Sequence, residues 1–145
     1  MIELSRQSCY SLSTLLAVAT SPENEFITIR DVAARGNISA SSIEAILPKL
    51  RRAGLIRTER GPSGGCALGR PSDRITVGDV VRAIEGAIEL AGEKGEAARA
   101  DEVEPSAVDL LLVKMAARLA DCLDSVTIGD LCTGRADFGR SKTMR

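Results

Sequence analysis

The sequence predicts a mostly α-helical fold with one small β-hairpin, and three observations support this. Aromatic residues make up 2% of the 145 residues, so the core must be built from Leu, Ile, Val and Ala, which suits helices. Apolar residues repeat with helical spacing in several segments. The segment from Ile56 to Gly69 instead combines two short strand-like runs with a Pro/Ser/Gly turn, which is typical of a hairpin.

The N-terminal segment predicts three helices. The first is expected from Ser5 to about Thr20. Thr28 to Asp31 has the capping-box pattern that opens a short second helix, which Gly36-Asn37 ends. After a turn of about three residues, Ser39 is a candidate N-cap for a third helix ending near Gly54. Two short helices joined by a tight turn are typical of a helix-turn-helix.

Helical spacing also predicts which side chains of these helices face the core. On the first helix the inner face is expected to hold Cys9, Leu12, Leu15, Leu16 and Ala19. On the third helix it is expected to hold Ile43, Ile46, Leu47 and Leu50. Pro48 removes one backbone hydrogen bond from this third helix but lies on its outer side, so we expect a bend rather than a break.

The third helix and the hairpin carry a concentration of positive charge. The chain as a whole has a net charge of −1, yet Lys49 to Arg60 contains five basic residues and one acidic residue. The hairpin is expected to pair Ile56–Arg60 with Cys66–Gly69 around a glycine-rich tip. A cationic helix followed by a cationic hairpin suggests a helix for a DNA groove and a wing for the backbone. The alternative is an ordinary solvated face.

Composition excludes several function classes. The chain contains no histidine, which excludes Cys/His zinc sites and Ser-His or Cys-His catalytic pairs. No convergent carboxylate pair or phosphate-cradling loop is visible, so we expect no enzyme and no metal site. Scarce aromatics argue against a single-strand binder that stacks bases. No apolar run approaches the roughly 18 residues of a membrane span and no secretion signal is present, so a cytoplasmic protein is expected.

The second half of the chain predicts further helices. Thr76 to Asp79 is a second capping-box pattern and opens a helix with Val77, Val80, Val81 and Ile84 inward. A longer helix, about 27 Å in length, is expected from Ser106 to about Asp124, with a short turn from Thr127. Its apolar stripe is formed by Val108, Leu111, Leu112, Met115, Leu119, Cys122 and Leu123. Such a helix is expected to pair with its copy in a dimer; the alternative is that it folds back within the chain.

These elements divide the chain into four parts. Residues 1–90 are expected to form a winged helix-turn-helix DNA-binding domain, and 91–105 a flexible loop without clear apolar period. Residues 106–132 are expected to form the dimerisation helix and a short cap, and 133–145 a disordered tail.

Several motifs are similar to those of a known family. They are Leu50-Arg-Arg-Ala-Gly-Leu55, Arg60-Gly-Pro-Ser-Gly-Gly65, Leu68-Gly-Arg70 and the segment Ile75–Ile84. With them the chain resembles the bacterial winged-helix transcription regulators that include IscR, NsrR and CymR, over residues 1–85 strongly and 106–131 loosely. The resemblance implies a homodimeric regulator, expected to be a repressor, that reads a partly palindromic site in double-stranded DNA. The rival hypothesis is a winged-helix protein-interaction module with weak or no DNA binding.

The resemblance also implies which residues contact DNA. The third helix corresponds to the recognition helix of the family. Its start is the usual place for base contacts and holds Ser39, Ser41, Ser42 and Glu44. A glutamate there can accept a hydrogen bond from cytosine N4. Contacts to phosphates or the minor groove are expected from Arg6, Lys49, Arg51, Arg52, Arg57 and Arg60. At the tip of the wing, Ser63, Gly64 and Gly65 expose backbone amides that could meet a phosphate.

The chain departs from the family in one respect that concerns its signal. Cluster-binding members carry three closely spaced cysteines in the loop before the dimer helix, but Ala91 to Glu104 contains none. We therefore expect no cofactor; an iron–sulfur cluster would need ligands other than the family's. The thiol-sensor candidates are Cys9, Cys66, Cys122 and Cys132, against the plainer interpretation that each is a small buried hydrophobe. A regulatory protein partner is a further candidate signal, as the cluster-free relative CymR suggests.

Overall fold

The computed structural model describes residues 3–22, 25–62, 64–90 and 104–134. Ser63, residues 91–103 of the predicted loop and residues 135–145 of the predicted tail lie outside the described residues. The elements in chain order are α1 (Arg6–Ala19), α2 (Ile29–Gly36), α3 (Ala40–Arg52), β1 (Ile56–Glu59), β2 (Gly65–Leu68), the 3₁₀ helix η1 (Ser72–Arg74), α4 (Val77–Glu85), α5 (Ala107–Asp124) and α6 (Ile128–Thr133).

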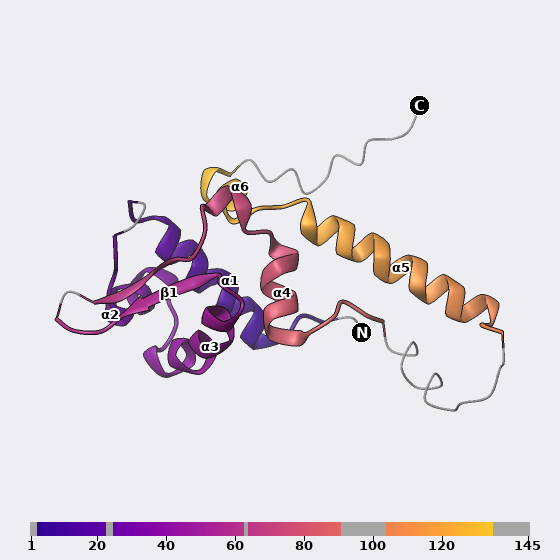
Figure 1. The fold of residues 1–145 in the computed structure, drawn as a ribbon, viewed down its shortest axis with the longest axis horizontal. Coiled ribbons are helices and arrows are strands. Elements are labelled where there is room, and N and C mark those ends of the chain that lie inside the picture. The colour runs from indigo at the N-terminus through magenta and orange to yellow at the C-terminus, as the bar shows by residue number, and fades with distance from the viewer. Residues whose placement is uncertain (1–2, 23–24, 63, 91–103, 135–145) are drawn as a thin grey trace.

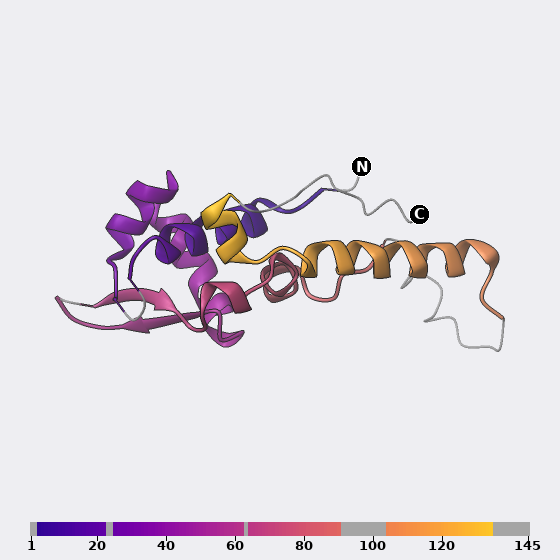
Figure 2. The same ribbon diagram turned by 90° about the horizontal axis from the view of Figure 1, so that it is seen from above.

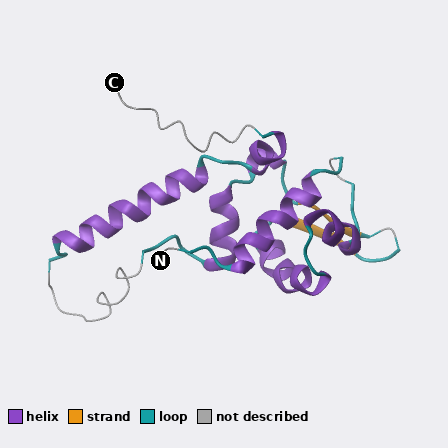
Figure 3. Cartoon of the chain, turned by 180° about the vertical axis from the view of Figure 1, so that it is seen from behind, coloured by secondary structure: helices purple, strands orange, loops and turns teal. Residues whose placement is uncertain are grey.

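The molecule consists of a body and one projecting helix. All elements except α5 gather into the body, and α5 extends away from it along the long axis (Figures 1 and 2). Seen from behind, the hairpin lies at the end of the body opposite to α5 (Figure 3). The predicted fold class, mostly helical with one hairpin and a long C-terminal helix, is therefore confirmed.

The core of the body is aliphatic, as the scarcity of aromatics predicted. Helix α1 lies at its centre and packs against α2, α3, α4 and α6. Burying each large aliphatic side chain contributes about 1.5–3 kcal/mol. The completely or almost completely buried ones are Leu15, Val32, Ile43, Ile46, Leu50, Leu55, Ile56, Ile75, Val80 and Ile128.

The predicted inner face of α1 is partly wrong. Cys9 is exposed, whereas Ser8, Ser11 and Thr14 are completely buried beside Leu15. The hydroxyl of Ser8 donates to Glu85 in α4, and that of Ser11 donates to a carbonyl of its own helix. Because their hydroxyls find partners, Ser8 and Ser11 can be buried where an apolar pattern would not place them.

An isolated β-bridge, which the sequence pattern did not predict, joins the two-stranded hairpin to the body. Strands β1 and β2 pair antiparallel, with Ile56 opposite Leu68 and Thr58 opposite Cys66. Ile27, in the α1–α2 connection, forms a bridge to Cys66 through two backbone hydrogen bonds of 2.9 and 2.7 Å. The wing is therefore fixed to the body on the side of β2.

The C-terminal segment returns to the body after α5. Thr76 and Thr127 form an antiparallel bridge, and α6 then packs against α1 and η1. Ile128 is completely buried in the core. The division at residue 90 stays a prediction, but α6 contributes to the same core as the N-terminal helices. Within the described residues, no helix is long and apolar enough to cross a membrane.

Candidate nucleic-acid interface

Helix α3 has one buried and one exposed face, as predicted. Its N-cap Ser39 accepts a hydrogen bond from the backbone of Ser42 at 3.2 Å. Ile43, Ile46 and Leu50 have no exposed surface, which fixes the helix to the core. The opposite face consists of exposed Ser41, Glu44, Ala45, Pro48 and Arg52.

The turn before α3 has the tight geometry expected of a helix-turn-helix. Asn37 caps α2 in the left-handed conformation with φ 51°, which asparagine tolerates better than most residues. Ile38 then enters the core at 9% exposed. Helix α2 therefore stops abruptly, and α3 begins two residues after the buried Ile38.

Pro48 does not interrupt helix α3. Helix α3 runs without interruption from Ala40 to Arg52 with Pro48 inside it. The prediction that the helix does not break is confirmed. Pro48 also lines a shallow groove between α3 and the wing together with Glu44, Arg51, Thr58 and Glu59.

The start of helix α3 carries a cluster of hydroxyl groups. The Ser39 hydroxyl lies 2.7 Å from that of Ser42 and 3.2 Å from that of Ser41. Ser39 is therefore engaged in capping the helix, and its bonds order the two other hydroxyls. Glu44 is exposed one turn further along.

The basic side chains at the end of α3 differ in how they are held. Lys49 Nζ donates to Gln7 Oε1 at 3.0 Å, which brings the start of α1, including exposed Arg6, beside α3. Arg51 Nη1 donates to Thr58 Oγ1 in β1 at 3.3 Å. Arg52 is exposed and meets no hydrogen-bond or ion-pair partner in the part of the chain that the structure describes.

These contacts involve residues that sequence reasoning missed. Gln7 orients Lys49 from 42 residues away in the chain, and Thr58 orients Arg51 from 7 residues away. Positive charge in the last turn also stabilises the negative end of the α3 dipole. The basic cluster therefore has a structural role besides any contact with DNA.

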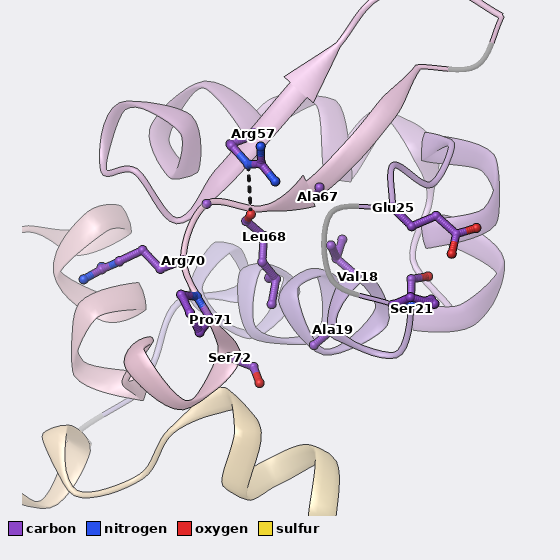
Figure 4. A pocket seen from close by; sticks show the side chains of 12 residues that line it. Val18, Ala19, Ser21, Glu25, Arg57, Ala67, Leu68, Arg70, Pro71 and Ser72 are labelled. Atoms are coloured by element: carbon purple, nitrogen blue, oxygen red, sulfur yellow. Dashed lines mark hydrogen bonds between the residues drawn. The ribbon is translucent and has the colours of Figure 1, made fainter.

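In the wing, Arg57 is fixed against the hairpin. Its Nε donates to the carbonyl of Leu68 at 3.2 Å, and its guanidinium lies 5.5 Å from the centre of the Phe26 ring. Arg57 lines a hollow of about 370 Å³ together with Val18, Ala19 and Leu68, and Figure 4 shows these side chains. Arg60 is exposed at the end of β1.

The glycines at the wing tip are required by close backbone contacts. A Cβ atom at Gly65, where φ is 152°, would overlap with the backbone of Ile27, and one at Gly64 with that of Glu59. The amide of Gly64 already donates to the carbonyl of Gly61 at 3.0 Å. The predicted phosphate contact of Gly64 thus competes with a bond inside the turn. Ser63 lies outside the described residues.

Helix α5 exposes apolar side chains over much of its surface. Its predicted stripe is divided: Leu112, Leu119 and Leu123 are half-buried. The four other members of the stripe are exposed, together with two apolar residues outside it. The exposed stripe members are Val108, Leu111, Met115 and Cys122, and the two others are Leu110 and Val113. Helix α5 projects from the body instead of folding back onto it along its whole length (Figure 1).

The four cysteines lie in different environments. Cys66 is buried, and burial raises the pKa of its thiol. Cys9, Cys122 and Cys132 are exposed in the single chain. The interpretation as a small buried hydrophobe is therefore wrong for these three residues. Desolvation also raises the pKa of the Cys132 thiol. Among the described residues no group of His, Cys, Asp or Glu is placed to hold a metal ion.

Comparison with known proteins identifies the family. The family model described as "Rrf2: Iron-dependent Transcriptional regulator" matches residues 4–134. The HTH-type transcriptional regulator IscR of Vibrio parahaemolyticus is 28% identical over 132 residues, covering 91% of this chain and 78% of that protein.

Two solved structures extend this similarity to the fold. CymR, the global cysteine regulator of B. subtilis, is 29% identical with a TM-score of 0.76, covering 92% of this chain and 98% of that one. The oxidised form of Staphylococcus aureus CymR is 28% identical with a TM-score of 0.68, covering 90% and 96%. The chain therefore belongs to the Rrf2 family and is a DNA-binding transcriptional regulator, not an enzyme.

Proposed function

We propose that the chain acts in the cytoplasm as a homodimeric repressor that binds a partly palindromic DNA site. Helix α3 enters the major groove and the wing contacts the backbone or the minor groove. The observation that carries this proposal is the division of α3 into a fully buried face and an exposed face of Ser41, Glu44 and Arg52. A helix that is rigidly seated and polar outward suits close approach to base edges.

The residues of this interface divide into two roles. Base contacts come from Ser41, Ser42 and Glu44, with Ser39 ordering the hydroxyls; these carry sequence preference. Phosphate contacts come from the basic side chains around them, which supply affinity and salt dependence. The phosphate-contact residues proposed are Arg6, Lys49, Arg51, Arg52, Arg57 and Arg60.

The dimer is supported by α5. Leu111 and Val108 are 54% and 62% exposed in the single chain. An exposed row of large apolar side chains on a projecting helix is typical of an interface between subunits. Pairing α5 with its copy gives the two-fold symmetry that a palindromic site requires.

We further propose that this member works without the family's iron–sulfur cluster. The residues present do not fit that group, because residues 91–104 lack the three cysteines that would ligate it. The signal is then a thiol reaction, a metabolite or a protein partner. Exposed Cys9 and Cys122 are the better thiol candidates, because a raised pKa makes Cys66 and Cys132 poorer thiolates.

DNA binding is tested by selecting bound duplexes from a random pool at low and high salt. The proposal expects a partly palindromic sequence and strong weakening of binding by salt. Glu44→Ala should change the preference at one base position by about 1–3 kcal/mol, or roughly 5- to 150-fold. Binding that is weak, without sequence preference and insensitive to salt would instead favour a protein-interaction module.

The signal is tested separately. Protein purified without oxygen should be colourless and should still bind the selected DNA; visible absorbance that is lost together with iron would contradict the cluster-free proposal. The thiol version predicts that diamide weakens DNA binding of the wild type. A Cys9→Ser/Cys122→Ser variant that responds to diamide like the wild type would exclude these two residues. A Cys66→Ser/Cys132→Ser variant is the matched control.

A further inference from the structure

A cluster of polar contacts joins α5 to the body at one carboxylate. Asp124, the last residue of α5, receives two hydrogen bonds from Arg82 of α4, Nη1 to Oδ1 and Nη2 to Oδ2, both 2.7 Å long. Thr76, the N-cap of α4, donates to Oδ1 at 3.3 Å. The carboxylate is 40% exposed, and its three donors come from α4 and the N-cap residue of that helix. The two-pronged Arg–carboxylate geometry defines its direction.

Gly78 allows this carboxylate to approach α4. A Cβ atom at Gly78 would overlap with Oδ1 of Asp124 and would lie 3.0 Å from Nη1 of Arg82. Gly78 lies in the first turn of α4, and in the interior of a helix glycine is about 1 kcal/mol less favourable than alanine. A glycine that costs helix stability yet makes room for one side chain indicates that the contact itself matters.

Backbone hydrogen bonds also connect the segment after α5 to the segment before α4. The amide of Val77 donates to the carbonyl of Val126, and the amide of Ile128 donates to the carbonyl of Ile75, both at 2.8 Å. The chain leaving α5 is thus bonded to the chain entering α4. Since α5 packs on α4, these contacts set the direction in which α5 leaves the body.

The contact between α5 and α4 is connected to helix α3 through the body. Helix α4 packs directly against α3 and α1. At the far end of α4, Glu85 accepts hydrogen bonds from the amide of Ser5 at 2.7 Å and the hydroxyl of Ser8 at 2.9 Å, which fixes α4 to the start of α1. A rotation of α5 at Asp124 would therefore move the whole body, including α3, relative to the dimer axis.

We propose that Asp124, Arg82 and Gly78 form a positioning joint that sets the distance between the two recognition helices of the dimer. The joint thereby selects the half-site spacing of the DNA site without any contact to DNA. Half-site spacing follows from protein geometry in dimeric helix-turn-helix proteins. The inference rests on the proposed homodimer, because a monomer has no spacing to select.

The test compares DNA duplexes whose half-sites are one or two base pairs closer or further apart than the selected spacing. The variants are Gly78→Ala, Asp124→Ala and the double variant. The wild-type dimer should bind the selected spacing roughly tenfold more tightly than the altered ones. In each single variant this ratio of affinities should fall to about twofold, because a loosened link lowers the effective concentration of the second half-site. Size-exclusion chromatography with light scattering should still show dimers.

The double variant and a control identify the cause. Gly78→Ala acts by displacing Asp124, so in the Asp124→Ala background it should cause no further loss. Asp121→Ala, which removes an exposed carboxylate from the preceding turn of α5, should keep the wild-type preference. A further loss in the double variant would remove Gly78 from the joint.

Failure of the inference and failure of the proposed function give different results. Wild-type protein that is monomeric, or that binds single half-sites as tightly as paired ones, would contradict the proposed function. A wild-type dimer that selects spacing, with both single variants selecting it equally well, would contradict the joint alone. Variants that dissociate into monomers would also overturn it, because the contacts would then serve assembly.

Discussion

At the scale of single residues, the basic side chains of the interface are not equivalent. Arg51 is bonded to Thr58, and Arg57 is bonded to the Leu68 carbonyl and lies over Phe26. An arginine of this kind must give up or share an existing contact when it meets a phosphate. Exposed Arg52 has no such contact to lose among the described residues, so it is the cleanest test of phosphate binding.

We predict that Arg52→Ala reduces the slope of log K against log salt by about one, because one phosphate contact is lost. Affinity should fall by a similar factor on all sequences, and the free energy of unfolding should change by less than about 0.5 kcal/mol. Filter binding over a salt series measures the slope. Arg118→Ala, an exposed arginine of α5, is the control; a slope unchanged in Arg52→Ala would remove Arg52 from the phosphate contacts.

Glu85 gives the protein a contribution to stability that depends on pH. Hydrogen bonds from the side chain and amide of Ser5, and from the hydroxyl of Ser8, hold the pKa of Glu85 below its ordinary value. A lowered pKa in the folded state means that the contribution is complete above the unfolded pKa of about 4.3. It is lost as the pH falls through the folded pKa.

We therefore predict that Glu85→Gln is less stable than the wild type near pH 7 and that the difference shrinks below about pH 4.3. Urea unfolding from pH 7 to pH 3 measures it. Glu25→Gln, an exposed carboxylate in the α1–α2 connection, serves as the matched control. A difference between Glu85→Gln and the wild type that stays constant over this range would show that charge on Glu85 does not matter.

At the scale of elements, α3 contains a proline that its local structure does not need. The helix continues through Pro48, although the ring removes the amide that would bond to the carbonyl of Glu44. We predict that Pro48→Ala raises the free energy of unfolding by about 1–3 kcal/mol, measured by urea denaturation. Pro71→Ala, outside the helices, should change it by less than about 0.5 kcal/mol.

The effect of Pro48→Ala on DNA binding separates two explanations for the proline. A variant that is more stable but binds DNA more weakly would show that the ring shapes the exposed face of α3 at a cost in stability. Unchanged or lower stability would contradict the prediction, because the ring would then contribute packing that outweighs the lost hydrogen bond.

Elements whose signals are local could be predicted from the sequence. The capping boxes of Thr76 with Asp79 and of Ser106 with Asp109 mark the starts of α4 and α5, and both are present in the structure. The face of α3 was predictable because its buried side chains are large and aliphatic. The face of α1 was not, because small hydroxyl residues are buried there by neighbours from distant parts of the chain.

The candidate site shows the same limit. Residue types and their order predicted helix α3 and the hairpin as structural elements, and their contacts with DNA stay a prediction. The bond from Lys49 to Gln7 and the bridge between Ile27 and Cys66 depend on segments about 40 residues apart in sequence. No periodicity encodes such pairs. The apolar pair Phe26-Ile27 before the α2 cap was a local signal that could have indicated a contact between this connection and the hairpin.

At the scale of the whole molecule, α5 is the element that the single chain leaves incomplete. Apolar side chains lie on both sides of the helix: Ala116 is buried and Leu112 half-buried, whereas Val108 and Leu111 are exposed to solvent. A helix that is apolar over most of its circumference is normally buried. The body covers one side near the C-terminal end, and the projecting part remains uncovered (Figure 2).

We predict that Leu111→Asp converts the proposed homodimer into a monomer whose body still folds. The side chain is 54% exposed in the single chain, so the aspartate costs the monomer little. In a two-fold dimer it would place two charges in one apolar interface, which costs several kcal/mol per dimer. Light scattering should show the monomer mass, and circular dichroism should show wild-type helix content at low concentration.

DNA binding then connects this quaternary change to function. The Leu111→Asp monomer should bind a single half-site like one wild-type subunit but should lose the gain from the second half-site, which is on the order of a hundredfold or more for linked binding modules. Asp121→Ala, which removes an exposed charge near the C-terminal end of the same helix, is the control and should remain a dimer. If Leu111→Asp stayed dimeric and bound the full site as tightly as the wild type, α5 would not be the dimer interface, and the subunits would have to meet through the body.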